Sequence, residues 1–301
     1  MVDHYLKETH ERRMRFHTRT PQSVVAFLAG CLPGMAQLHQ RMFSIFGMVC
    51  RLPNSILHRH AIRVLIASKP SAKSWFTEIR NLCLMYLLPH PLSLLEAPTT
   101  KDKYKKLVKQ KIVNFWEIRL RNEASSLSSL EFFQPNFMSV CSPHPIWTTA
   151  GSSSYQVAMS TVQGLMISGR YRTEQLCRHW SANKKGFCQA PSCIGLELVE
   201  DLQHILLKCA SLEPTRQKML SFTSSYSQPF EILQPILSII YLRKQSSFCQ
   251  FLIDCSVLPA VITATQQYGP DTLHHLFRIT RTWRYCLHKA RLKILGRWIS
   301  H

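Results

Sequence analysis

Apolar side chains that recur every three or four residues are the feature that most constrains the fold of this chain. Leu38, Met42 and Ile45 fall on one face of a helix, and Pro53 then ends the run. A second stretch with this spacing lies near 55–67. Glycine is scarce, with 10 residues in 301. We therefore expect a mainly α protein, because sandwiches and barrels usually need more glycine at their turns.

A strongly basic stretch follows at residues 101–123, which hold eight Lys or Arg and three acids. Tyr104, Val108 and Ile112 recur within it at helical intervals. This pattern predicts an amphipathic basic helix. Along the whole chain we predict five segments: a basic leader at 1–20, a helical region at 21–122, a Ser/Pro-rich linker at 123–154, a Cys/His unit at 155–215 and a basic helical region at 216–301.

The charge balance favours polyanionic partners. The chain has 37 Lys or Arg against 17 Asp or Glu, a net charge of +20. Such an excess says little about the fold but indicates nucleic acid, an anionic surface or an acidic protein as a partner. The apolar runs are too short to cross a bilayer, so we expect no membrane association.

Eleven cysteines are scattered from Cys31 to Cys286, and the charged start of the chain has no apolar signal region. We therefore expect reduced thiols in an intracellular protein of the nucleus or cytoplasm, not a secreted disulfide framework.

Three cysteines and one histidine cluster in the stretch "GFCQAPSCIGLELVEDLQHILLKC". The spacing is Cys188-x4-Cys193-x10-His204-x4-Cys209. Two short-range pairs separated by a loop can supply four tetrahedral ligands. On an α-helix, however, residues five apart lie about 140° apart, so Cys209 would have to follow the last helical turn. A core helix whose buried Cys and His bind no metal is the alternative interpretation.

The surrounding sequence resembles a known family. The segments "GRYRTEQLCRHWS", "GFCQAPSC" and "EDLQHILLKC" are similar to the carboxy-terminal cysteine–histidine region of non-LTR (LINE-type) retrotransposon reverse transcriptases. The upstream "FLAGCLPGMAQLHQRMFSIFGMVCRLP" looks like the helical region after the polymerase palm, and "PHPIWTTAG" looks like part of the linker. The resemblance covers roughly 21–215.

The resemblance implies one bound zinc ion. Carried over residue by residue, its ligands are Cys188, Cys193, His204 and Cys209. The first pair departs from the family pattern, because four residues separate the cysteines where the family has two. Cys177 or His179 are possible substitutes for one ligand.

The catalytic parts of that family are missing. A polymerase needs carboxylates that hold metal ions, and the chain has no Asp-Asp pair. Pro270-Asp271 resembles part of a nuclease motif found in some relatives, but no acid follows it. We therefore expect no enzymatic activity and no small-molecule substrate. The resemblance implies a nucleic-acid-binding tail, from a truncated copy.

Basic residues mixed with aromatic residues mark the expected contacts with RNA or DNA, since arginine neutralises phosphate and rings stack on unpaired bases. A second set lies on a basic amphipathic helix predicted within 272–301. The predicted contacts are Arg170, Tyr171, Arg172, Arg178, Trp180, Arg278, Arg281, Arg284 and Lys289. The same arginines could instead cover apolar surface with their stems. The rival function is a metal-free helical interaction or scaffold protein with no nucleic-acid role.

Overall fold

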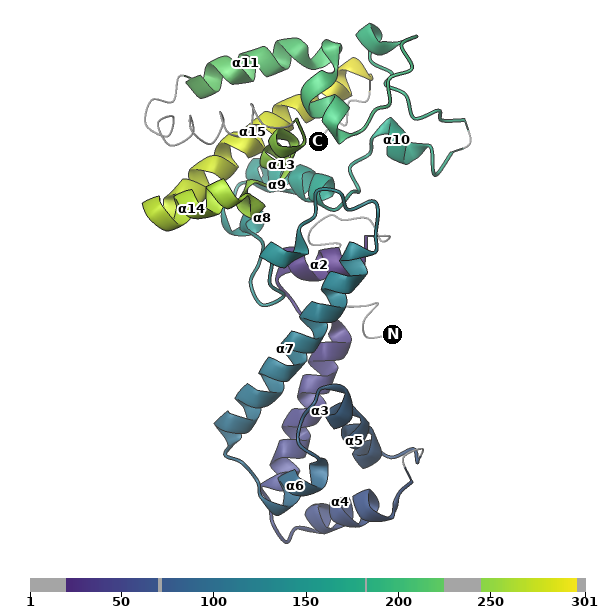
Figure 1. Cartoon of the computed structure of the whole chain (residues 1–301), viewed down its shortest axis with the longest axis vertical. Coiled ribbons are helices and arrows are strands. Elements are labelled where there is room, and N and C mark those ends of the chain that lie inside the picture. Colours follow the sequence, from purple (N-terminus) through teal and green to yellow (C-terminus); the bar gives the residue numbers. More distant parts are fainter. Residues whose placement is uncertain (1–19, 70–71, 182, 225–244, 297–301) are drawn as a thin grey trace. The chain divides into compact units, whose positions relative to one another are not determined.

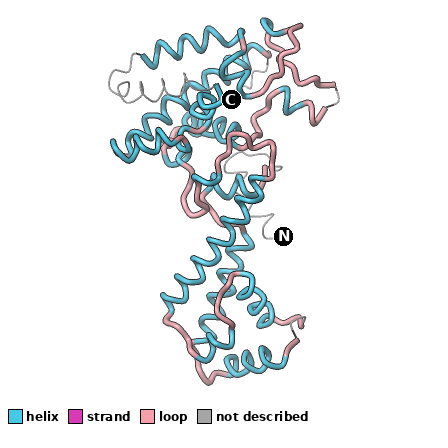
Figure 2. The backbone as a smooth tube through the Cα atoms, viewed as in Figure 1, coloured by secondary structure: helices cyan, strands magenta, loops and turns pink. Residues whose placement is uncertain are grey.

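The computed structural model describes residues 20–69, 72–181, 183–224 and 245–296. It confirms a mainly α fold (Figures 1 and 2). Among the described residues the only β pairing is an isolated antiparallel bridge between Phe187 and Val199. No described helix combines the length and the apolar character needed to cross a bilayer.

The described chain forms two compact units. Unit 1 contains residues 21–126 and 139–142, and unit 2 contains residues 127–138 and the described residues from 143 onward, together with Thr20. The boundary therefore falls inside the stretch predicted as a linker. The predicted leader lies outside the described residues except for Thr20.

Unit 1 is helical throughout. Its helices are α2 (Gln22–Ala29), α3 (Gly34–Cys50), α4 (Ile56–Ala67), α5 (Trp75–Met85), α6 (Pro91–Glu96) and α7 (Lys101–Ser125). Helix α7 packs against α2 and α3, as Figure 1 shows, while α4 packs against α5 and α6. Ser74 and Thr77 form a capping box that fixes the start of α5.

Helix α7 is the amphipathic basic helix that the sequence predicts. One buried residue follows another every four positions along it, at Tyr104, Val108, Ile112, Trp116, Leu120 and Ala124. The Trp116 indole N–H donates to the Tyr86 hydroxyl at 2.9 Å, and His39 Nδ1 lies 2.7 Å from the same oxygen. The lysines between these positions are mostly exposed. Buried hydrogen bonds at the Tyr86 hydroxyl thus accompany the apolar stripe of α7.

Unit 2 is built around one long helix, α15 (Pro270–Ile294). The other elements are η1 (Pro135–Phe137), α8 (Pro145–Thr148), α9 (Ser154–Ile167), α10 (Glu174–Cys177), η2 (Pro191–Cys193), η3 (His204–Lys208), η4 (Ala210–Leu212), α11 (Glu213–Ser224), α13 (Gln245–Ile253), η5 (Cys255–Val257) and α14 (Pro259–Tyr268). Helices α9, α11, α13 and α14 and the turns η3 and η4 all contact α15. The predicted Cys/His unit and the predicted basic helical region therefore share one core.

Two arginines of α15 belong to that core. Arg284 is fully buried and donates to the Ile253 carbonyl at 3.0 Å, at the end of α13. Arg281 is 3% exposed and donates to the Ile146 and Thr149 carbonyls at the end of α8. Cationic side chains satisfy the free carbonyls at helix C-termini and interact favourably with the helix dipole. These arginines therefore join α8 and α13 to α15.

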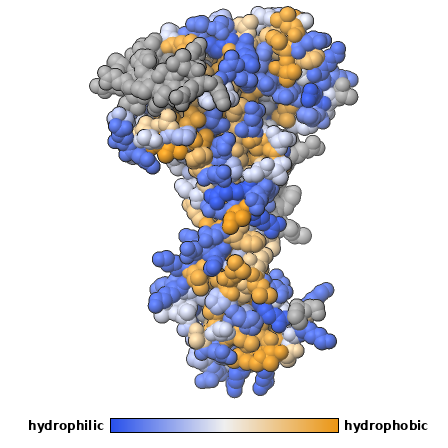
Figure 3. Space-filling model, viewed as in Figure 1, coloured by the Kyte–Doolittle hydropathy of each residue, from blue (hydrophilic) through white to orange (hydrophobic). Residues whose placement is uncertain are grey.

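The surface of the molecule mixes hydrophilic side chains with apolar ones (Figure 3). On unit 1 the large exposed apolar residues include Ile56 and Ile66. On unit 2 four of them, Ile194, Leu196, Leu198 and Val199, lie in one loop. Single exposed apolar residues are common on soluble proteins, and we assign no role to this loop.

Candidate metal centre

The four residues that the sequence singles out as ligands lie together. The sulfur atoms of Cys188, Cys193 and Cys209 and a ring nitrogen of His204 all lie within 4.8 Å of one another. Each of the four side chains is buried, with at most 4% of its surface exposed. Among the described residues this is the one group of His, Cys, Asp and Glu that could hold a metal ion in this way. The alternatives Cys177 and His179 are not part of it.

A short turn compensates for the wide spacing of the first pair. Pro191–Cys193 forms a 3-10 turn in which the Cys193 N–H donates to the Ala190 carbonyl at 2.8 Å. The Cys188 N–H donates to the Leu198 carbonyl at 2.8 Å, across the bridge between Phe187 and Val199. The turn and the bridge fold the loop back on itself. Both cysteines therefore reach one point although four residues separate them.

The second pair meets through a π turn. Residues His204–Lys208 are π-helical, and the Cys209 N–H donates to the His204 carbonyl at 2.7 Å. An α-helix would place residues five apart about 140° apart. A hydrogen bond from residue i+5 back to residue i widens the turn and brings these two positions to the same side. Such π turns occur often at functional sites.

Side chains form hydrogen bonds with the backbone groups at both ends of this π turn. The Asp201 carboxylate accepts the His204 backbone N–H at 2.6 Å. At the other end, buried Arg216 donates to the Cys209 carbonyl and to the Ile205 carbonyl. Arg216 is itself held by Glu213, at 2.9 Å. Outer-shell contacts of this kind hold metal ligands in position. No spacing rule marks Arg216 in the sequence.

A buried ion pair joins the loop to α15. The Glu200 carboxylate accepts from Arg291 and from the Glu174 backbone N–H, the latter at 2.9 Å. Both members of the pair have side chains at most 6% exposed. The Arg291 guanidinium also lies over the Tyr171 ring, 5.6 Å from its centroid. Glu200 lies two residues before the first helical residue, Leu202.

The three thiols of the cluster differ in the direction in which their pKa values are shifted. Side-chain contacts with Cys188, His204 and Cys193 lower the pKa of Cys209 to about 4. The contact with Cys209 and burial raise the pKa of Cys188, while burial and the nearby Cys209 charge raise that of Cys193. Thiolates this close repel one another, so full deprotonation needs a cation between them.

The structure separates the predicted nucleic-acid contacts into two groups. Arg172, Arg178, Trp180, Arg278 and Lys289 are exposed, and Arg170 is half-buried. Trp180 is 44% exposed. The exposed arginines 172 and 178 flank the short helix α10. All of these side chains except Arg170 face the solvent.

Tyr171, Arg281 and Arg284 are corrections to that prediction. Tyr171 is 5% exposed, and its hydroxyl lies 2.9 Å from His288 Nδ1. The two arginines bind helix-end carbonyls in the core, as described above. Helical periodicity placed them at the sides and rear of an amphipathic helix, but α15 is surrounded on several sides by other helices. All three side chains are therefore buried and contact other groups of the protein.

No family model, curated protein or solved structure matches the chain.

Proposed function

We propose that unit 2 holds one structural zinc ion and binds nucleic acid without catalysing a reaction. The four-ligand cluster carries the first part of this proposal. Zinc with bonds of about 2.3 Å to sulfur and about 2.0 Å to nitrogen separates tetrahedral sulfurs by about 3.8 Å and a sulfur–nitrogen pair by about 3.5 Å. The sulfur pairs Cys188–Cys209 and Cys193–Cys209 are 3.9 and 3.8 Å apart, and Cys193 Sγ lies 3.7 Å from His204 Nε2.

The donor set also favours zinc and a structural role. Three thiolates and one imidazole are soft and borderline ligands of the type that zinc prefers. Four protein ligands leave no open coordination position for a water molecule or substrate, and all four are buried. A zinc ion at this site would stabilise the loop without taking part in chemistry.

Exposed cations around the centre support the second part of the proposal. Arg172, Arg178 and Lys185 are exposed within the same loop region, and the partly exposed Trp180 lies two residues after Arg178. Cations neutralise phosphates, and an exposed ring offers a face on which an unpaired base can stack. The whole-chain charge of +20 adds long-range attraction.

The resemblance to non-LTR reverse transcriptases also supports a nucleic-acid-binding role. In that family the Cys/His region lies on the carboxy-terminal side of the polymerase, so the proposed role is that of a non-catalytic binding tail. The proposal does not require an identified relative. It rests on the ligand geometry and on the exposed cations of this chain.

Metal analysis tests the zinc site and separates it from the rival metal-free scaffold. Protein purified without added zinc should contain about one zinc per chain. Cys209→Ser should lose the metal, because a hydroxyl is a far weaker ligand than a thiolate. His179→Ala should keep it, since His179 is exposed and outside the cluster. Metal-free wild-type protein with the same thermal stability as protein refolded with zinc would contradict the proposal.

A further inference from the structure

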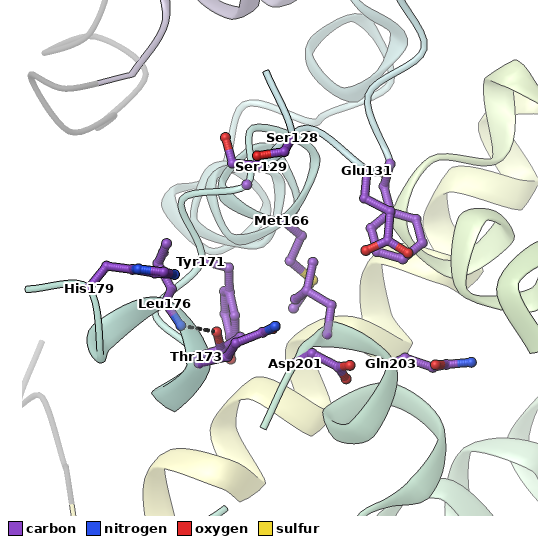
Figure 4. Close-up of a pocket in the computed structure, with 14 residues that line it drawn as sticks. Ser128, Ser129, Glu131, Met166, Tyr171, Thr173, Leu176, His179, Asp201 and Gln203 are labelled. Carbon is purple, nitrogen blue, oxygen red and sulfur yellow. Dashed lines mark hydrogen bonds between the residues drawn. The ribbon is translucent and has the colours of Figure 1, made fainter. Parts of the chain in front are cut away.

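A cleft of about 330 Å³ lies in unit 2 beside the metal centre (Figure 4). Its volume is at the lower end of the range of about 300–1,000 Å³ in which small-molecule sites fall. One wall is formed by residues 201–203, which directly precede the ligand His204. The other walls come from residues 128–132 and from residues 169–179, around α10. Three segments distant in sequence therefore enclose it.

The cleft is lined mainly by polar groups, among them two carboxylates. Glu131 and Asp201 supply these carboxylates, while Leu176 and the almost fully buried Met166 supply a smaller apolar area. Figure 4 shows the Glu131 carboxylate turned towards the side of the cleft that carries Asp201. One oxygen of the Asp201 carboxylate already accepts a hydrogen bond from the His204 backbone N–H. An ionised carboxylate only accepts hydrogen bonds, so the ligand must present N–H or O–H donors.

The charges around the cleft narrow the class of ligand. Arg172 and Arg178 are exposed, and their chain neighbours Tyr171, Thr173 and His179 line the cleft. A cationic ligand would be repelled by these arginines and by the net charge of +20. A simple anion would be repelled by the two carboxylates. A nucleotide suits both regions, since its phosphate is anionic while its base carries neutral donors on an apolar ring.

We infer that this cleft takes one unpaired guanine base of a bound strand, with Glu131 accepting from its N1–H and 2-amino groups and with Arg172 or Arg178 on the adjoining phosphates. Guanine is the base with two adjacent donors on its Watson–Crick edge, which match the two oxygens of one carboxylate. Adenine and cytosine place an acceptor beside their amino group, and uracil has a single N–H between two carbonyls. Leu176, which is partly exposed, packs on the ring. The inference rests on the proposed nucleic-acid binding and names the base that the same unit prefers.

The metal centre supports one wall of this cleft. Asp201 caps the π turn that carries His204, so a bound metal fixes the position of residues 201–203. Loss of the metal should therefore abolish the base preference while the arginines still attract phosphates. This coupling makes the metal a positioning element for recognition.

The test compares short uridine strands that carry one central guanine, inosine, adenine or cytosine. Binding to the zinc-loaded full chain is measured by fluorescence anisotropy at one salt concentration. Inosine lacks only the 2-amino group, so the guanine strand should bind roughly tenfold more tightly, the ratio expected for one hydrogen bond to a charged group. A 7-deazaguanine strand should match guanine, because N7 is not used.

Glu131→Gln should reduce the guanine-to-inosine ratio to near one, because an amide offers only one acceptor. Glu197→Gln, which removes an exposed acid of the metal loop that does not line the cleft, should keep the ratio. An equal affinity for guanine and inosine in the wild type, or a preference that survives Glu131→Gln, would overturn the inference. So would tighter binding of an arginine-rich peptide that Glu131→Gln abolishes. Failure of every strand to bind would instead refute the proposed function.

Discussion

Several charged side chains of unit 2 act inside the protein and not on its surface. Arg281 and Arg284 donate to carbonyls at the ends of α8 and α13, and Arg291 pairs with Glu200. Burial lowers the pKa of Arg284 to about 9, which still leaves it charged at neutral pH. Each arginine therefore loses hydration that only fixed partners can replace. These residues should be sensitive to substitution for reasons of folding.

Arg291→Met should destabilise unit 2 by about 3–5 kcal/mol, because it leaves the Glu200 carboxylate buried without its partner. The free energy of unfolding from urea titration measures this loss. Lys293→Met, at an exposed position of the same helix, should change stability by less than about 0.5 kcal/mol.

The double variant Glu200→Gln with Arg291→Met should recover part of the loss, since no charge then remains buried at the pair. A double variant less stable than the sum of the two single losses would show that the pair is not the cause.

At the scale of elements, the candidate metal site depends on short irregular segments. A 3-10 turn, an isolated bridge and a π turn supply the four ligands. None of these pieces is stable alone, because short turns have few hydrogen bonds for the chain entropy that they lose. A structural metal contributes its binding free energy to the folding of the segment that carries its ligands.

Removal of the metal with a chelator should therefore loosen residues 186–212 and spare the helical core. Hydrogen exchange of that loop should accelerate at least tenfold, because the metal no longer restrains its ligands. Helix α9, which carries none of the ligands, should keep its protection. The control is the same protein refilled with zinc. Unchanged exchange in 186–212 would mean that packing alone holds the loop.

At the scale of the whole molecule, positive charge is exposed on both units. Lys101, Lys103, Lys105, Lys106 and Lys109 are exposed on α7, and Arg278 and Lys289 are exposed on α15. Under the proposed function, general attraction to polyanions would therefore involve both units. Specific contacts of one surface must be distinguished from attraction to the charge of the whole protein. The dependence of binding affinity on salt concentration allows this distinction.

Arg172→Ala with Arg178→Ala should weaken binding of a single strand and flatten the plot of log affinity against log salt. The change in slope should be up to about two units, one for each lost phosphate contact. Arg59→Ala with Arg63→Ala removes the same charge from exposed positions of α4 and should leave the slope nearly unchanged. Equal effects of the two pairs would indicate bulk charge with no defined surface.

The sequence by itself determined the helical class of this protein, the buried stripe of α7 and the four candidate metal ligands, while it left Cys177 and His179 open as substitutes for one of them. Each of these follows from local spacing. A residue every four positions buries one face of a helix whatever packs against it, as Val108, Ile112 and Trp116 show. Cys and His residues separated by short gaps similarly stay close in space, so Cys188, Cys193, His204 and Cys209 could be named without a fold.

Only the tertiary structure decided which basic residues face solvent and how the ligands meet. The pattern of α15 reads as one apolar face with basic sides, yet Arg281 and Arg284 lie inside because α8 and α13 end beside them. The π turn at His204 and the cleft between residues 131 and 201 likewise depend on distant segments. The spacing of residues in the sequence predicts on which face of its own helix a side chain lies. It does not predict which carbonyls, helix ends or loops from other parts of the chain that side chain contacts.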